Sequence, residues 1–177
     1  MQLETPQLRL CPMTLADLFK AGKVLAEVAG TYGAKTPRIG FWEMHNKRKI
    51  YKAKKNLLIK TPGAWLLTTS WLLIRKRDNM LVGEAGFKGL PMARGDVEIG
   101  YGILDGFRRK GYMTEAIGAL TQMAFSMENF RINRVTALTL RDNTASHRTL
   151  EKSGFTRRPP IGKYVRWEIK RQADDNI

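Results

Sequence analysis

The segment "DGFRRKGYMTEA", residues 105–116, places three consecutive cations and a glycine directly before a strongly periodic apolar stretch. The apolar run "VEIGYGIL" precedes it, so the pattern predicts a strand, a glycine turn and a helix start. The first N–H groups of a helix have no partner within it, and the helix dipole adds partial positive charge there. Gly111 permits a close backbone approach, and Arg108, Arg109 and Lys110 add attraction. The segment is therefore expected to bind a phosphate or pyrophosphate.

Two common phosphate loops do not fit this segment. A P-loop requires Gly-x-x-x-x-Gly-Lys-Ser/Thr, whereas here the lysine precedes the glycine. A dinucleotide fingerprint requires Gly-x-Gly-x-x-Gly, and "GYGILDG" has the wrong third interval. A charged surface turn that ends in a glycine is the alternative interpretation.

Glu98 is the candidate general base, acting through water. Alternation along the preceding strand puts this carboxylate on one face together with two glycines, and such glycines leave space that can admit a ligand. An exposed glutamate on a solvated face is an equally weighted alternative. The two expected faces are Val97, Ile99, Tyr101 and Ile103, and Glu98, Gly100, Gly102 and Leu104.

Hydrophobic periodicity predicts one α+β domain over residues 1–177, with a mixed, mainly antiparallel sheet flanked by helices. Thr14 is expected to cap the first helix and Asn143 the last one. The expected strands are 7–13, two strands within 65–90 that turn at Asp78–Asn79, 96–104, 133–140 and 163–171. The expected helices are 14–30 with Leu15, Leu18, Phe19 and Leu25 as its stripe, 41–59 with Ile50, Ala53 and Leu57, 113–130, and 143–155.

The net charge of +15 favours anionic partners. Much of it lies in Asn46–Lys60, which could contact nucleic acid, a ribosomal surface or a phosphate-bearing cofactor, or could serve only solubility. No apolar run approaches membrane-spanning length, no secretory pattern is visible, and Cys11 is the single cysteine, so the cytoplasm is the expected compartment. His45 and His147 have no partner spacing that indicates a metal site. Cys11 and the tryptophans are expected in the core or in a pocket wall.

The run "RRKGYM" is similar to the Arg/Gln-x-x-Gly-x-Gly/Ala signature of the GNAT acyltransferases. Residues Val97 to Phe155, with the Asn143-x-x-Ser146 segment and the "LEKSGF" ending, resemble the RimJ/RimL-type branch of that superfamily. The resemblance implies that the backbone amides of the turn hold the pyrophosphate of coenzyme A. It also implies that backbone groups of the strand end pair with the pantetheine arm, beside the cap asparagine. The implied cofactor-binding residues are Ile103, Leu104, Arg108, Arg109, Lys110, Gly111, Tyr112, Met113, Thr114 and Asn143.

Two positions depart from the family pattern. Met113 occupies the sixth signature position, where its amide remains usable, and Leu150 stands where many members carry a tyrosine that protonates the leaving thiolate. Ser146 is a candidate proton donor in its place, and the alternative is that a thiol with a pKa of about 8.5 leaves as the thiolate and needs no donor.

The expected function is an acetyl-CoA-dependent N-acetyltransferase, in which a primary amine attacks the thioester directly in a ternary complex. By resemblance alone, the first acceptor is a protein N-terminus, such as that of a ribosomal protein. One alternative is a small-molecule amine, and another is a non-catalytic nucleic-acid or ribosome-binding module on the same scaffold. A monomer or homodimer without membrane contact is expected.

Overall fold

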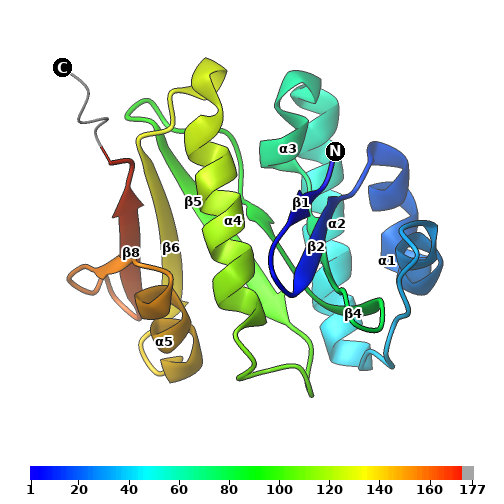
Figure 1. Ribbon diagram of the computed structural model, residues 1–177. Helices are drawn as coiled ribbons and strands as arrows, with labels where there is room; N and C mark the ends of the chain where they lie inside the picture. Colours follow the sequence, from blue (N-terminus) through cyan, green and yellow to red (C-terminus); the bar gives the residue numbers. More distant parts are fainter. Residues whose placement is uncertain (173–177) are drawn as a thin grey trace.

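The computed structural model describes residues 1–172, apart from the side chains of residues 41–43. Within this part, eight strands form one sheet in the order β1-β2-β3-β4-β5-β6-β8-β7 (Figure 1). All neighbouring strands are antiparallel except β5 and β6, which are parallel. The strands are β1 (Leu3–Glu4), β2 (Leu8–Pro12), β3 (Trp71–Arg75), β4 (Met80–Phe87), β5 (Asp96–Ile103), β6 (Arg134–Leu140), β7 (Thr156–Arg157) and β8 (Tyr164–Lys170).

The helices cover both faces of this sheet. They are α1 (Leu15–Thr31), α2 (Phe41–Lys60), α3 (Trp65–Thr68), α4 (Tyr112–Ser126) and α5 (Thr144–Lys152), with short 3-10 turns at Pro62–Ala64 and Glu128–Phe130. Strand β3 shows how the two cores arise, because its side chains alternate between faces. Trp71 and Leu73 join the core that includes α4 and Leu150 of α5, whereas Leu72 and Ile74 join the core under α1 and α2. The expected mainly antiparallel α+β fold is confirmed.

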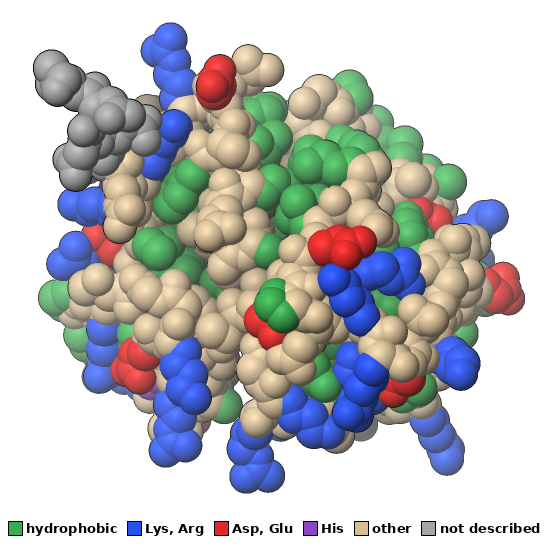
Figure 2. Space-filling model, viewed as in Figure 1, with side chains coloured by type: hydrophobic (Ala, Val, Ile, Leu, Met, Phe, Trp, Pro, Cys, Tyr) green, Lys and Arg blue, Asp and Glu red, His purple; other side chains and the backbone are tan. Residues whose placement is uncertain are grey.

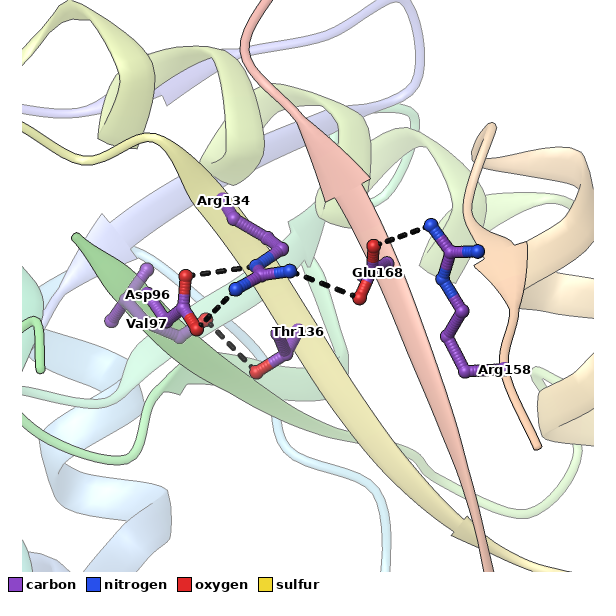
Figure 3. Close-up of polar contacts among 6 residues, drawn as sticks. All are labelled: Asp96, Val97, Arg134, Thr136, Arg158 and Glu168. Atoms are coloured by element: carbon purple, nitrogen blue, oxygen red, sulfur yellow. Dashed lines mark hydrogen bonds and ion pairs between the residues drawn. The ribbon is translucent and has the colours of Figure 1, made fainter. Parts of the chain in front are cut away.

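The parallel pair is held together at one end only. Strands β5 and β6 pair over Asp96–Glu98 and Arg134–Thr136, and no further pairing between them occurs in the described residues. A ladder of charges crosses the paired end (Figure 3): Arg134 binds Asp96 through two hydrogen bonds of 2.8 and 2.7 Å and reaches Glu168 on β8 at 3.3 Å. Arg158 binds the other oxygen of Glu168 at 2.7 Å and holds the pKa of this buried carboxyl below its usual range.

The predicted apolar stripe is largely confirmed for α1 and wrong for α2. In α1, Leu18 and Leu25 are buried as predicted, together with Ala21, whereas Phe19 is 56% exposed. In α2, Ile50 is 50% exposed. The expected cap of α1 is confirmed: Thr14 accepts a hydrogen bond from the Asp17 amide, and Asp17 accepts one from the Thr14 amide.

The buried face of α2 is instead partly polar. Among the described side chains of α2, those of Tyr51, Lys54 and Leu58 are buried, while Ala53 is exposed and Leu57 only half-buried. This orientation follows from polar partners on β4, since Tyr51 donates to Glu84 at 2.6 Å and Lys54 donates to the carbonyl oxygen of Phe87. Burial lowers the pKa of Lys54 to about 8, and nearby Lys88 adds to this effect. Lys54 is therefore not a free surface cation.

The segment before β3 is also different from the expectation. Residues Trp65–Thr68 form a helical turn after Pro62, and the strand begins only at Trp71. The Trp65 indole N–H donates to the carbonyl oxygen of Met13 at 2.9 Å, which fixes this turn over the end of β2. The predicted turn at Asp78–Asn79 is present, with Asn79 at φ 53°.

Other expected core residues lie as predicted. Trp71, Trp167 and Cys11 are buried, and burial raises the pKa of the Cys11 thiol. The Trp42 side chain lies outside the described residues. No group of three or more potential metal ligands occurs among the residues that the structure describes. Over the same residues, no helix is long and apolar enough to cross a membrane.

Candidate active site

The end of β5, the loop 104–110 and the start of α4 form the predicted anion site (Figure 1). Gly111 is the N-cap residue of α4 and has φ 81°, a left-handed conformation that favours glycine. No side chain caps α4, whereas Thr14 caps α1 and Asn143 caps α5. The first amides of α4 therefore lack the side-chain acceptor that those two helices have, and they are suited to binding an anion.

The three cations of the loop differ in their surroundings. Arg108 forms an exposed ion pair with Asp105 at 2.8 Å, and Lys110 donates to the carbonyl oxygen of Gly106 at 3.1 Å. Arg109 is exposed and adopts φ 59°, which is unusual for a residue other than glycine. Lysine and arginine side chains crowd the lower edge of the molecular face in Figure 2. This edge is where Figure 1 places the start of α4.

Arg75 of β3 contacts both the loop 104–110 and the start of α4, a role that the sequence did not suggest. Arg75 is 6% exposed, and the central carbon of its guanidinium lies 5.0 Å from the centre of the Phe107 ring and 5.8 Å from that of the Tyr112 ring. It also pairs with Asp78 at 2.5 Å and donates to the Tyr112 hydroxyl at 3.3 Å. The hydrogen bond that Arg75 donates to the Asp78 carboxylate is the main cause of the raised pKa of Arg75. Through Asp78 and Arg75, the β3–β4 turn thereby helps to position Phe107 in the loop and Tyr112 at the start of α4.

The first turn of α4 contributes its backbone more than its side chains. Tyr112 and Met113 are buried in the core, so only their amides face the loop. The Glu115 carboxylate accepts hydrogen bonds from the Thr5 hydroxyl at 2.6 Å and from the Gln7 amide at 3.1 Å. Glu115 thus anchors the β1–β2 turn against the start of α4.

The edge of β5 that faces β6 carries backbone groups for binding an extended ligand. The Leu104 amide donates to Val82 of β4 at 2.8 Å, and its carbonyl oxygen accepts from Phe107 at 3.1 Å. Both backbone groups of Leu104 are thus engaged within the fold. Because backbone groups alternate sides along a strand, those of Tyr101 and Ile103 point the other way, toward the unpaired part of β6. The geometry favours Ile103 over Leu104 and adds Tyr101, which the sequence did not single out for this role.

The face of β5 that carries Glu98 is open at Gly102 but not at Gly100. No described atom outside the adjacent residues lies within 4 Å of the position that a Gly102 Cβ would take, whereas Cε of Lys88 would lie 3.3 Å from a Gly100 Cβ. Glu98 lies on this face and forms an ion pair with Lys88, and its side chain is 26% exposed. One carboxylate oxygen of the predicted base is therefore already engaged by a lysine.

Glu84 is a second carboxylate on this face. It is the register partner of Gly102, and its side chain is 11% exposed. One of its oxygens accepts hydrogen bonds from Lys47 and Tyr51 of α2, each at 2.6 Å. Lys47, like Lys54, is therefore held against the sheet. Glu84 shares its face of β4 with one glycine, Gly86, so its sequence signal is weaker than that of Glu98, which shares its face with two.

The start of α5 follows the end of β6, beyond the part of β6 that pairs with β5. Asn143 accepts a hydrogen bond from the Ser146 amide at 3.1 Å, which confirms its predicted role as a cap. Leu150 is fully buried in the core. His147, expected on the surface, is half-buried; its ring lies 5.4 Å from that of Trp167, and Nε2 lies 3.0 Å from the Leu140 carbonyl oxygen.

Residues 7–156 match the family described as "Acetyltransferase (GNAT) domain". The chain belongs to the GNAT acetyltransferase family. It is 33% identical over 165 residues to the uncharacterized N-acetyltransferase YjdG of Bacillus subtilis (strain 168), which covers 93% of this chain and 95% of the relative.

Solved structures of other acetyltransferases share the GNAT fold with this chain, among them two acetyltransferases of ribosomal proteins. One is the ribosomal-protein-S5-alanine acetyltransferase from Vibrio fischeri, with a TM-score of 0.68, 14% identity and coverage of 99% of this chain and 98% of the other. The second is RimL, a ribosomal L7/L12 alpha-N-protein acetyltransferase in complex with coenzyme A, with a TM-score of 0.68, 13% identity and coverage of 96% and 98%.

This GNAT protein is an acetyl-CoA-dependent N-acetyltransferase, and its residues fit that donor. The uncapped start of α4 and the loop cations suit the pyrophosphate. The β6-facing backbone groups of Tyr101 and Ile103 suit the amide-bearing pantetheine arm. Acetyl-CoA supplies an activated thioester, and the chain supplies the positioning and charge that the transfer needs.

Proposed function

We propose that this acetyltransferase modifies the α-amino group of a protein N-terminus. The observation that carries the proposal is the ion pair between Glu98 and Lys88 on the open face of β5. A carboxylate that already accepts from a lysine is poorly placed to deprotonate a strongly basic amine. Such a site suits an acceptor that loses its proton readily at neutral pH.

The ordinary pKa values of amines separate the two classes of protein acceptor. An α-amino group has a pKa of about 7.7–8.0 and a lysine side chain one of about 10.4. At pH 7.5, roughly a third of α-amino groups but only about 0.1% of lysine amines are neutral. The neutral nitrogen attacks the thioester carbonyl directly in a ternary complex, and water carries away the released proton.

Other features support a protein acceptor. Two of the structures that share this fold are acetyltransferases of ribosomal proteins. The net charge of +15 favours an anionic acceptor or one presented on an anionic surface such as a ribosome. The single cysteine agrees with a reducing compartment, so we place the activity in the cytoplasm.

Matched peptides test the proposal. One peptide has a free α-amine and no lysine, and its partner has the same sequence with a blocked α-amine and one lysine. Thiol release and mass spectrometry should show acetylation of the first peptide, at a kcat/KM at least 100-fold higher than for the second. Equal or higher kcat/KM with the lysine peptide, or with a panel of small amines, would overturn the assignment.

A further inference from the structure

The Tyr101 side chain carries a polar group that the fold itself does not use. Its hydroxyl oxygen is shielded from solvent and has no hydrogen-bond partner within the described residues. Leaving a buried hydroxyl unpaired is unfavourable, and most such groups in folded proteins have a partner. Where a fold accepts this cost, a ligand that completes the hydrogen bond is a natural explanation.

The hydroxyl lies on the α4 and α5 side of β5, beyond the point where β5 and β6 stop pairing. Tyr101 packs with Val97 and Ile99 against the core under α4. The Ser146 side chain, in the first turn of α5, is close enough to oppose the rise in the pKa of Tyr101, although the two groups do not reach hydrogen-bonding geometry. Tyr101 thus belongs to the part of β5 that does not pair with β6 and that presents a free backbone edge.

We propose that Tyr101 donates a hydrogen bond to the sulfur of acetyl-CoA as the carbon–sulfur bond breaks. Nucleophilic attack forms the bond between the amine nitrogen and the carbonyl carbon. When the carbon–sulfur bond breaks, its electron pair stays on sulfur, and the proton lost by the amine passes to water. Tyr101 keeps its own proton throughout and stabilises the thiolate that leaves. This role does not depend on which amine is the acceptor.

Acidity decides between a hydrogen bond and a complete proton transfer. The ordinary pKa of tyrosine is about 10, and burial raises that of Tyr101 further. A thiol has a pKa of about 8.5, so moving the proton from the phenol to the thiolate would be unfavourable. A phenol that stays protonated at all working pH values remains a permanent donor. This role differs from the proton transfer to the thiolate that the sequence suggests for Ser146.

Tyr101→Phe tests the proposal, with Tyr164→Phe as the matched control, because Tyr164 is exposed on β8 and outside the site. The pH dependence of CoA binding, followed by the ultraviolet absorbance of the thiolate, reports the pKa of the bound thiol. We expect this pKa to be at least one unit higher in Tyr101→Phe than in the wild type. The dissociation constant of acetyl-CoA, whose sulfur carries no charge, should change by less than about twofold.

Two further readouts separate this role from a structural one. The kcat of Tyr101→Phe should fall about 10- to 100-fold, as expected for a lost hydrogen bond to a charged group. The thermal midpoint of the ligand-free variant should rise, because an unpaired buried hydroxyl is removed. The proposal is overturned if the bound thiol has the same pKa in both proteins, or if the variant loses stability and acetyl-CoA affinity together. An unexpected acceptor would revise the proposed function and leave this test unchanged.

Discussion

Replacing Gly111 by aspartate and by asparagine separates backbone strain from charge at the predicted phosphate site. The two side chains have nearly the same shape, and both tolerate the left-handed conformation better than most residues. Gly111 has φ 81°, and no described atom lies within 4 Å of an added Cβ. Neither substitution creates a steric clash, so both variants should fold with a similar, modest loss of stability.

The charge is the difference between them. Two unit charges about 4 Å apart interact by about 1 kcal/mol in water and by about 4 kcal/mol near a protein surface. Position 111 is exposed, so the lower part of this range applies. Gly111→Asp should therefore weaken acetyl-CoA binding at least tenfold, about 1.4 kcal/mol, relative to Gly111→Asn.

Isothermal titration calorimetry at low and high salt measures this difference, with thermal denaturation as the check on folding. The gap between the two variants should narrow as salt rises, because exposed charges are screened. Equal affinities for the aspartate and asparagine variants would refute the placement of phosphate at the start of α4.

Three further perturbations follow from the surroundings of individual side chains. If Glu98 is the general base, Glu98→Gln should lower kcat by about 10²- to 10⁴-fold at constant acetyl-CoA affinity. Lys88→Met frees the carboxylate and should not lower kcat. Equal losses of kcat in both variants would instead indicate that the ion pair is structural. Because the folded pKa of Lys54 is near 8, below its unfolded value of about 10.4, the folded state binds fewer protons between these values and its stability should rise with pH there. Urea denaturation at pH 7 and pH 9.5 should show this gain in the wild type, and Lys54→Met should lack the share due to this residue, roughly 2 kcal/mol over this interval. Neutralising the exposed lysines of α2 should slow acetylation of anionic acceptors in a salt-dependent way and leave the acetyl-CoA dissociation constant unchanged; a loss of cofactor affinity would contradict this. These lysines are Lys49, Lys52 and Lys60.

The order of the elements could be predicted because each has a local signal. The apolar stripe of α4, the caps Thr14 and Asn143, and the turn at Asn79 all lie within a few residues of the structure they specify. The buried face of α2 could not be predicted, since it depends on Glu84 of β4, more than 20 residues away in the chain. From the sequence alone, a lysine or tyrosine on a helix is predicted to face solvent, because its partner on another element is not known.

In the candidate site, too, residues with a local sequence signal could be predicted and residues that act through tertiary contacts could not. Gly111 is recognisable because a left-handed residue before a helix requires a special residue type at that position. The supports of the site are not recognisable, since Arg75 reaches the loop through tertiary contacts with Phe107 and Tyr112. The engagement of Leu104 with β4 likewise depends on strand register, which a local pattern does not specify.

The incomplete pairing of β5 and β6 explains how one sheet can both hold its shape and bind an extended ligand. Unpaired backbone groups inside a sheet are unfavourable, so such a gap needs compensation nearby. The two-pronged contact between Arg134 and Asp96, extended to Glu168, fixes the strands at their paired end. At the other end, Asn143 fixes the start of α5 beside the gap. With both ends held, the free edge at Tyr101 stays open in the absence of ligand, and binding completes hydrogen bonds without having to separate the strands first.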